Sequence, residues 1–455
     1  MTGVNVVLLG SGGREHAIAW KLAQSSRLGK LWTAPGNAGT AEFGENVDVR
    51  ATDVEEVVAL AKRVRADLVI VAPDDPLAAG VVDALAAEGI AAFGPTKAAA
   101  ELEWSKSFAK QVMRDAGIPT ADSRVFEDAG EARRYVEGLG GPCVVKADGL
   151  ALGKGVTVCD DVAQALAAID AAMVGRAFGE AGARVVIEER MRGPEVSAHA
   201  FSDGVTVRHM PFSCDHKPVF DGNLGPNTGG MGVYSPPGWL RPEHVSFIER
   251  EVTEATVRAM AGIGRPYRGV LYPGMMVADS GPRVVEFNCR FGDPETEVLL
   301  PRLRSDLLAI CDAVAHGRLA GVPVEWSEAA TVGVVMASGG YPGTYETGFP
   351  IEGLDDVDGD VQVFLAGAKR DEAGMLRTSG GRVLCVVASG ATVAEARVRA
   401  YENVRRIRFE GAHYRTDIGA TADARSLVGD RNSQYSDPLS FEPSSWAPQT
   451  GCGRC

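Results

Sequence analysis

Long apolar runs are missing from this 455-residue sequence, and so is any surplus of basic residues. No stretch reaches the roughly 18 consecutive apolar residues of a membrane span. The opening stretch MTGVNVVLLGSGG has no basic segment before its short apolar run, which predicts a buried strand rather than a signal peptide. With 60 acidic against 46 basic residues the net charge is -14, which disfavours non-specific nucleic-acid binding. We therefore expect neither a membrane nor a nucleic acid as a partner, and an anionic substrate needs local cations, backbone N–H groups or a metal.

Cysteine is also scarce, with eight residues in the chain. Cys143, Cys159 and Cys385 fall inside apolar strand-like runs, as expected of reduced thiols in a cytoplasmic protein. Cys452 and Cys455 form a CxxC pair at the end of the sequence, but no second pair accompanies it to complete a zinc site. We interpret residues 426–455, rich in Ser, Pro, Gln and Gly, as a disordered tail.

Strand-like and helix-like patterns alternate over the first hundred residues, which predicts a parallel sheet with helices on its faces. The stretch KAAAELEWSKSFAKQVMRDAG, which follows, predicts one helix closed by Gly117 and Pro119. The whole chain is predicted to be an α/β and α+β multidomain protein. Its expected parts are an N-terminal α/β domain (1–103), a body (104–117 and 190–327), a small inserted unit (118–189) and a strand-rich C-terminal domain (328–425).

The stretch GSGGREHA follows the first strand and opens a helix. Glycines there let backbone N–H groups approach an anion, and the helix N-terminus adds partial positive charge. The dinucleotide pattern GxGxxG fails because Glu15 stands at its third glycine, so a nicotinamide cofactor is disfavoured. A tight strand–helix turn explains the glycines alone, but it does not explain the run of Arg14, Glu15 and His16, which favours a small phosphorylated ligand with Arg14 beside it.

The stretch VVKADGLALGKGV places Lys146 in an apolar strand and Lys154 in a glycine-flanked turn. A lysine in a buried strand is costly unless an anion compensates it. Gly153, Lys154 and Gly155 could fold over phosphates, although the P-loop spacing is absent. The alternative is an edge lysine that reaches solvent, followed by a plain hairpin turn.

Two acidic stretches follow. In VVIEERMRGPEVS, Glu188, Glu189 and Glu195 lie near a strand end, where backbone can read an adenine edge and a carboxylate can accept from ribose; a solvated acidic loop is the alternative. In VVEFNCRFGDPETEVLL, strand alternation puts Glu286 and Asn288 on one side, both offering oxygen to a hard cation such as Mg²⁺. Arg290 follows on that side, ready to bind a carboxylate or phosphate, unless the three simply pair with one another.

The stretch HKPVFDGNLGPNTGGMG, residues 216–232, has five glycines, two prolines and no apolar period. Structureless stretches of this length are uncommon in compact proteins and are usually disordered or functional.

In chain order, GGREHA, APGNAGT, FGPTKAAAELEWSK, VVKADGLALGKGV, DHK, GPNTGGMGVYSP, EFNCRFGDPE and GGRVLCV resemble the glycinamide ribonucleotide synthetase (phosphoribosylamine–glycine ligase) family of the ATP-grasp superfamily. GPNTGGMG together with NCRFGDPET is very specific. The resemblance covers about residues 3–425. It implies that the N-terminal domain is a preATP-grasp domain that binds phosphoribosylamine, and that the inserted unit is a lid on an ATP-grasp body.

The resemblance also implies residue roles. Lys106 and Lys146 would hold ATP phosphates under the loop that contains Gly153, Lys154 and Gly155, while Glu188, Glu189 and Met191 would hold adenine and Glu195 ribose. Glu286 and Asn288 would bind Mg²⁺ or Mn²⁺, and Arg290, with Lys217 a weaker candidate, would be catalytic. The expected substrate-binding residues are Gly12, Gly13, Arg14, Glu15, Asn37, Asp215, Asn227, Thr228, Gly229, Gly230 and Asp293.

The implied chemistry is ATP-dependent ligation of glycine to 5-phosphoribosylamine through glycyl phosphate, giving glycinamide ribonucleotide, ADP and phosphate. We expect a cytoplasmic monomer with ATP and Mg²⁺ or Mn²⁺ as cofactors. Another ATP-grasp carboxylate–amine ligase and a nucleotide-binding regulator without turnover are the alternatives. Departures from the family pattern at Asp74, Trp104, Leu152 and Pro218 leave rate and substrate preference open, and Met275 and Met276 offer no further metal ligand.

Overall fold

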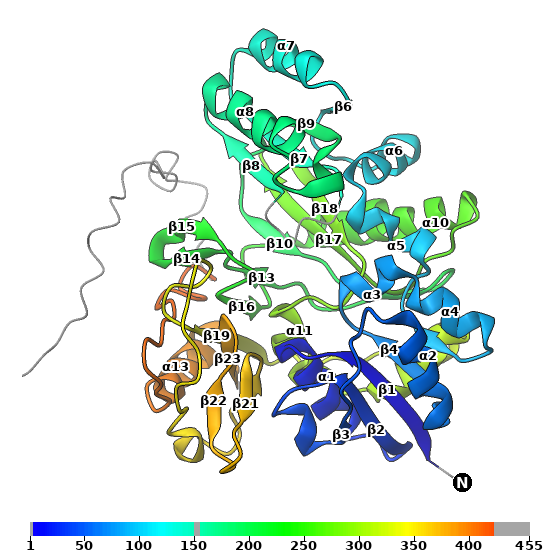
Figure 1. Ribbon diagram of the computed structural model, residues 1–455, viewed down its shortest axis with the longest axis vertical. Helices are drawn as coiled ribbons and strands as arrows, with labels where there is room; N and C mark the ends of the chain where they lie inside the picture. The colour runs from blue at the N-terminus through cyan, green and yellow to red at the C-terminus, as the bar shows by residue number, and fades with distance from the viewer. Residues whose placement is uncertain (1–2, 150–154, 423–455) are drawn as a thin grey trace, which may run out of the picture.

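The structure is a computed structural model that describes residues 3–149 and 155–422. These residues form three five-stranded sheets, one four-stranded sheet and two hairpins, arranged as lobes around a central region (Figure 1). The predicted tail and the turn residues Gly153 and Lys154 lie outside the described residues.

The N-terminal sheet is parallel, in the order β3-β2-β1-β4-β5. Its central strand β1 buries Val6, Val7, Leu8 and Leu9 completely, as expected of a strand covered on both faces. The predicted α/β architecture of this part is confirmed. Its elements are β1 (Val4–Gly10), α1 (Gly13–Leu22), β2 (Leu28–Pro35), β3 (Glu45–Asn46), α2 (Val54–Arg63), β4 (Leu68–Val71), α3 (Asp74–Ala79), α4 (Val81–Ala87) and β5 (Ala92–Phe93).

The inserted unit forms a separate antiparallel sheet, in the order β6-β9-β7-β8, that projects at the top of Figure 1. Helices α7 and α8 pack on it and form a small apolar core of their own with side chains such as Phe126, Val136 and Ile169. This core gives the unit the independence that a lid requires. Its elements are β6 (Ser123–Phe126), α7 (Ala129–Leu139), β7 (Cys143–Ala147), β8 (Val156–Cys159), α8 (Val162–Ile169) and β9 (Val185–Glu189).

The body is built on strand β17, which pairs with β10, β11 and β18. The sequence predicted one helix ahead of this sheet, which is wrong, because the chain leaves helical geometry at Ser105. Ser105 caps the start of a second helix, where its Oγ accepts from Phe108 N at 3.2 Å. The body elements are α5 (Lys97–Trp104), α6 (Lys106–Ala116), β10 (Glu195–Ser197), β11 (Ala200–Asp203), β12 (Val207–His209), α9 (Pro242–Phe247), α10 (Ala255–Gly262), β17 (Arg268–Ala278), β18 (Gly281–Asn288), α11 (Glu295–Leu299) and α12 (Leu307–Ala315).

The C-terminal sheet has the order β13-β16-β19-β23-β20 and takes two strands from the middle of the chain. Strands β13 and β16 flank the glycine-rich stretch, and β16 pairs with β19 from Gly232↔Val334 to Ser235↔Thr331. The glycine-rich stretch is therefore held at the junction of body and C-terminal sheet. The elements are β13 (Cys214–Asp215), β14 (Pro218–Phe220), β15 (Leu224–Asn227), β16 (Gly232–Ser235), β19 (Ala330–Ala337), β20 (Gln362–Leu365), β21 (Ala368–Arg370), β22 (Leu376–Thr378), β23 (Arg382–Gly390) and α13 (Val393–Val404).

Helix α1 also contacts the C-terminal sheet. His16 is buried, and its Nδ1 accepts a hydrogen bond from Leu365 N at 2.7 Å. Its ring meets that of Phe364 edge-on, with the centroids 5.5 Å apart. Burial lowers the pKa of His16 to about 4, so the imidazole is neutral at this contact.

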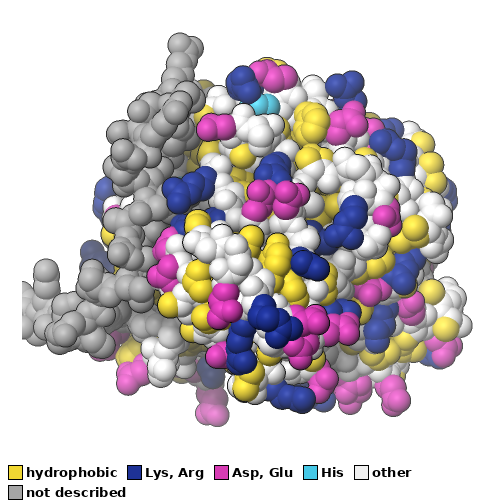
Figure 2. Space-filling view, turned by 90° about the horizontal axis from the view of Figure 1, so that it is seen from above, with side chains coloured by type: hydrophobic (Ala, Val, Ile, Leu, Met, Phe, Trp, Pro, Cys, Tyr) yellow, Lys and Arg dark blue, Asp and Glu magenta, His cyan; other side chains and the backbone are white. Residues whose placement is uncertain are grey.

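On the face shown in Figure 2, basic and acidic side chains of the described residues are interspersed, with apolar side chains between them. Among the helices that the structure describes, none is long and apolar enough to cross a membrane.

We predict that His16→Asn weakens the protein at pH 7 by about 1–3 kcal/mol, because the ring contacts with Phe364 are lost while the amide oxygen can still accept from Leu365. The deficit should shrink at pH 5. The pKa of His16 is 6.5 in the unfolded chain and about 4 in the folded protein, so between these pH values the unfolded chain binds a proton on His16 more readily. The wild type therefore loses folding stability through His16 as the pH falls, and the variant, which lacks this histidine, does not. Urea unfolding at both pH values measures this, and a deficit independent of pH would contradict it.

Candidate active site

The glycine-rich stretch is more ordered than the sequence predicts. Strands β14 and β15 form a hairpin within it, so its expected lack of structure is wrong for residues 218–227. Arg415, 1% exposed, donates to Pro218 O at 3.0 Å and to Asn223 Oδ1 at 3.0 Å. Asp221 accepts from Thr416 N at 2.8 Å. A segment almost two hundred residues further along the chain therefore fixes the hairpin.

Beyond the hairpin, Thr228 folds the backbone back on itself. Its N and Oγ1 donate to Lys217 O at 2.8 and 2.7 Å, and Gly230 N donates to Thr228 Oγ1 at 2.9 Å. Asn227 is exposed on β15. A Cβ on Gly230, whose φ is +122°, would lie 2.5 Å from Pro294 Cδ and 2.8 Å from Asp215 Oδ1, so only glycine fits there.

Asp215 and Lys217 form a pair beneath this turn. Lys217 Nζ lies 3.2 Å from Asp215 Oδ2 and 3.9 Å from Glu195 Oε2. Burial raises the pKa of Asp215 to about 7, although Lys217 opposes the shift. Burial would lower the pKa of Lys217, but Asp215 and other acidic neighbours raise it well above its usual value. The pair therefore joins an ammonium group whose pKa is raised to a carboxyl group whose pKa is close to neutral pH. Asp215 Oδ1 makes no hydrogen bond within the described part of the chain.

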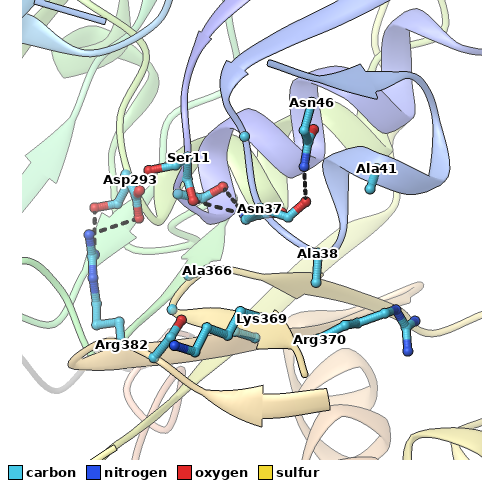
Figure 3. A pocket seen from close by; sticks show the side chains of 15 residues that line it. Ser11, Asn37, Ala38, Ala41, Asn46, Asp293, Ala366, Lys369, Arg370 and Arg382 are labelled. Carbon is cyan, nitrogen blue, oxygen red and sulfur yellow. Dashed lines mark hydrogen bonds and ion pairs between the residues drawn. The ribbon is translucent and has the colours of Figure 1, made fainter. Parts of the chain in front are cut away.

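Arg382, on β23, joins the glycine-rich stretch to the turn after β18. Its Nη1 donates to Gly229 O at 2.8 Å and to Asp293 O at 2.9 Å, and its Nη2 lies 3.0 Å from Asp293 Oδ1. Burial would raise the pKa of Asp293, but Arg382 and two other arginines lower it overall, which keeps the carboxylate charged. This junction forms one end of a cavity of about 680 Å³ between the N-terminal and C-terminal sheets (Figure 3).

The N-terminal glycine turn forms part of the cavity wall that comes from the N-terminal domain, opposite the wall from the C-terminal domain. Gly12 lines the cavity, and its N–H donates to Glu15 Oε2 at 2.5 Å. Arg14 is buried, with its Nε 2.6 Å from Glu15 Oε1 and its Nη1 donating to Phe291 O at 3.1 Å. Arg14 and Glu15 thus pair with each other beneath the turn and are not among the lining residues.

Asn37 stabilises the same wall. Its Nδ2 donates to Ser11 O and Leu365 O, both at 2.8 Å, and its Oδ1 accepts from Gly39 N at 2.8 Å. Asn37 faces the cavity while it connects the β1 turn to strand β20 (Figure 3).

A buried ionic cluster lies where the lid meets the body. Glu188 forms ion pairs with both lysines: its Oε2 lies 3.0 Å from Lys146 Nζ and its Oε1 lies 3.1 Å from Lys110 Nζ, and the three side chains are 2–4% exposed. Lys146 Nζ also donates to Val285 O at 2.9 Å. Burial lowers the pKa of Lys110 to about 8, while Glu188 opposes the shift. One carboxylate faces two ammonium groups, so the cluster can accept a further anion.

Lys106 begins α6 beside this cluster. Its Nζ donates to Gly149 O at 2.9 Å, at the entrance to the predicted phosphate loop. Burial lowers the pKa of Lys106, although Glu286 opposes the shift. Gly155 is buried, and its carbonyl accepts from Ala147 N at 2.7 Å.

The remaining predicted nucleotide contacts lie at the end of β9 and just after it. Glu189 is exposed, where its carboxylate pairs with Arg283 and accepts from Asp122 N at 3.2 Å. Met191 is partly buried, and Glu195 is exposed at the start of β10.

Asn288, the last residue of β18, and Arg290 just after it lie on one side, since Arg290 Nη2 donates to Asn288 Oδ1 at 3.0 Å. This contact is also part of the alternative in which these side chains pair with one another, although Glu286 does not join it. Arg290 Nε also lies 3.3 Å from Glu103 Oε1, and Glu103 accepts from Cys289 N at 2.6 Å. Burial would lower the pKa of Arg290, but Glu103 and Asp74 raise it overall, so its charge is secure. Within the described residues, the Glu286 carboxylate makes no hydrogen bond or ion pair that would block a cation.

Family comparisons match this arrangement along most of the chain. Models of phosphoribosylglycinamide synthetase match residues 4–103 (N domain), 104–296 (ATP-grasp (A) domain) and 331–421 (C domain). The chain belongs to the phosphoribosylglycinamide synthetase family. It is thereby an ATP-grasp ligase of purine biosynthesis, and the resemblance inferred from GPNTGGMG and NCRFGDPET is confirmed.

Named relatives agree over their full length. Phosphoribosylamine–glycine ligase of Allochromatium vinosum is 51% identical over 426 residues, which cover 93% of this chain and 99% of that protein. The ligase of Halalkalibacterium halodurans is 46% identical over 431 residues, covering 95% and 100%. The crystal structure of phosphoribosylamine–glycine ligase from Thermotoga maritima has a TM-score of 0.81 at 36% identity, covering 91% of this chain and 100% of that one.

Four residues of the candidate site in this phosphoribosylglycinamide synthetase family member were not predicted from the sequence: Glu103, Lys110 and Arg382, described above, and Lys369, which lines the cavity. Lys110 and Glu103 look like ordinary polar positions of a helix, and only the fold shows that Lys110 is buried and that Glu103 is partly buried beside Arg290. Arg382 falls inside GGRVLCV, which carries part of the resemblance, so an arginine before a buried strand was an available signal. Lys369 lies in an unremarkable hairpin.

We predict that Arg382→Leu lowers the free energy of unfolding by about 1–3 kcal/mol, because it leaves the Asp293 carboxylate without its partner. Asp293→Asn in the Arg382→Leu background should cost much less than in the wild type, giving a coupling of about 1 kcal/mol or more in a double-mutant cycle. Arg399→Leu, which removes an arginine paired with the exposed Asp360, is the matched control and should cost under about 1 kcal/mol. Additive effects at Arg382 and Asp293 would contradict the junction.

Proposed function

We propose that this chain joins the carboxylate of glycine to the 1-amino group of 5-phosphoribosylamine at the expense of ATP, giving glycinamide ribonucleotide, ADP and phosphate. The observation that carries the proposal is the Arg382 junction, which connects the cavity, the glycine-rich turn and the Arg290 strand end in a chain that matches all three family domains.

The reaction needs activation, because the glycine carboxylate is a poor electrophile. Its oxygen attacks the γ-phosphorus of ATP; a C–O–P linkage forms, the bond from the γ-phosphorus to the bridging oxygen breaks, and ADP leaves. The amine of phosphoribosylamine then attacks the acyl carbon, and phosphate leaves as the amide forms and the amine loses a proton. Such steps depend on positioning and on cations that spread the charge.

We assign the residues accordingly. Lys146, Lys106 and the loop up to Gly155 hold the ATP phosphates, with residues 188–191 at adenine and Glu195 at ribose. Arg290, held by Glu103 and Asn288, binds the glycine carboxylate and acyl phosphate, and Asp215 with Lys217 contacts the glycine end. Gly12, Asn37 and Asp293 line the phosphoribosylamine cavity, and Arg14 and Glu15 support the turn from beneath. We also assign Gly13, Thr228, Gly229 and Gly230, which lie outside that lining, to substrate binding.

We propose that a divalent cation, Mg²⁺ or Mn²⁺, binds at the Glu286 carboxylate and takes Asn288 Oδ1 as its second ligand, in exchange for the hydrogen bond from Arg290 Nη2. No group of three or more acidic, His or Cys side chains suited to a metal occurs among the described residues. That suits a metal which takes one or two protein ligands and completes its shell with phosphate oxygens and water. When bound, the ion would neutralise phosphate charge. We propose further that the protein acts as a cytoplasmic monomer, divided at the domain boundaries predicted above, and its six described cysteines, all free and buried, support a reducing compartment.

The test is ADP release with ATP, Mg²⁺, glycine and phosphoribosylamine generated in the cuvette. We expect ADP only with the complete mixture, and glycinamide ribonucleotide as the product by mass spectrometry. Turnover with a different acid–amine pair but not with glycine would overturn the proposal, and so would ATP binding without any turnover.

We predict that Lys146→Met weakens ATP binding at least about tenfold, because it removes the ammonium that a phosphate would meet. Its melting temperature should stay near that of the wild type, since Lys110 remains to neutralise Glu188. Isothermal titration with ATP and a thermal melt measure the two effects. Lys62→Met, at an exposed pair with Glu88, is the control and should change neither. Unchanged ATP affinity in Lys146→Met would show a purely structural lysine.

A further inference from the structure

The cations of the cavity all lie on one wall. Lys369 and Arg370 come from strand β21 and Arg382 from strand β23, both in the C-terminal part of the chain, while the wall from the N-terminal domain contributes neutral groups such as Ser11 and Asn37 (Figure 3). Asp293 is the one acidic residue among the lining residues.

These three cations are not equally available to a ligand. Arg382 is committed to Asp293 and Gly229. Arg370 donates to Gly374 O at 3.2 Å and lies 4.0 Å from Glu42, in a pair whose side chains are both more than half exposed. Within residues 3–149 and 155–422, Lys369 forms neither an ion pair nor a side-chain hydrogen bond. The β21 end of the cavity therefore has uncompensated positive charge.

The opposite wall is closed to an anion. A helix N-terminus such as that of α1 is ordinarily a good phosphate site, but its Gly12 N–H already binds the Glu15 carboxylate at 2.5 Å. A Cβ on Gly12 would lie 3.0 Å from Asp293 Oδ2, so a second carboxylate stands close by. A phosphate placed there would meet two carboxylates, and the Arg14 guanidinium that could offset them points into the protein.

We propose that Lys369 and Arg370 form the binding site for the phosphate of the sugar-phosphate substrate, and that its amino end lies toward Asp293. This inference rests on the proposed function and orients the substrate within that site. A phosphate monoester carries about -1.5 to -2 charge at neutral pH, which two cations match. At the other end the Asp293 carboxylate accepts from the amine or a ribose hydroxyl beside the turn at Gly229, where the acyl group would be presented.

The orientation has a consequence for specificity. The phosphate is far from the bonds that change, so its binding energy serves to select and align the amine. Loss of the two cations should therefore raise the KM for phosphoribosylamine and leave kcat at saturation almost unchanged.

The experiment compares the wild type with Lys369→Ala, Arg370→Ala and the double variant. Ribose 5-phosphate, ribose and inorganic phosphate serve as calorimetric probes, and steady-state kinetics are measured for all three substrates. Arg377→Ala is the matched control, because Arg377 faces Lys369 across the β21–β22 hairpin, pairs with Asp371 and is not a lining residue. It shows what damage to the hairpin alone would do.

We expect the double variant to lose at least about tenfold in affinity for ribose 5-phosphate and to raise the KM for phosphoribosylamine by at least the same factor. The KM values for glycine and ATP should stay within about twofold. Wild-type affinity should fall in the order ribose 5-phosphate, inorganic phosphate, ribose, and the control should behave as the wild type.

Three results would overturn the assignment while leaving the ligase activity intact: an unchanged KM for phosphoribosylamine in the double variant, an equal effect in Arg377→Ala, or inorganic phosphate binding as tightly as ribose 5-phosphate. The last would indicate a site for free phosphate alone. Absence of ligation by the wild type would instead refute the proposed function, so the two failures are distinct.

Discussion

The contact of Arg382 with Asp293 and Gly229 is the interaction on which the rest of the site depends. One guanidinium, at the start of strand β23, fixes the turn after β18, the glycine-rich turn and the edge of the cavity. Its charge is also needed locally. Burial and the nearby Asp293 raise the pKa of Glu297 well above its usual value, whereas Arg382 and two other arginines lower the pKa of Asp293. Without the guanidinium, the buried Glu297 and the partly buried Asp293 would be two acids without their common basic neighbour at the point where three segments meet.

Local placement of charge also explains how a protein of net charge -14 can bind anions. Its general field repels ATP and a sugar phosphate alike, so attraction must be local. At the lid, Lys110 and Lys146 share the single carboxylate of Glu188, which leaves an excess of one positive charge in a nearly inaccessible place. In the cavity, by contrast, Lys369 and Arg370 are exposed and Arg382 alone is neutralised. The buried positive charge at the lid suits an enclosed phosphate chain, whereas the exposed positive charge in the cavity can bind a ligand that arrives from solution.

Local patterns in the sequence were enough for the parts of the site that lie within one strand or turn. Strand alternation predicted that Asn288 and Arg290 lie on one side, and the two side chains are hydrogen-bonded; the motif order predicted the family and its fold. Contacts between distant segments were not predictable in this way. Arg14 was expected to lie beside a phosphorylated ligand, yet its side chain pairs with Glu15. The hairpin at 218–227 is held by hydrogen bonds from Arg415 and Thr416, far along the chain. The sequence does not show which oppositely charged residue a given side chain will pair with, because that choice depends on burial in the folded protein.

The glycine content of residues 216–232 follows from crowding as much as from mobility. Gly230 has Pro294 on one side and Asp215 on the other, and Gly229 lies against the Arg382 guanidinium, so a side chain at Gly230 would push apart the strands that carry the substrate residues. Its φ of +122° adds a second reason, because other residues are strained there. A turn that is tight for these reasons holds its N–H and C=O groups in fixed directions. In the proposed reaction such fixed groups would stabilise an acyl phosphate without the cost of ordering a loop during each turnover. Glycine is thus the residue that allows rigidity here, since it alone permits the packing that makes the turn rigid.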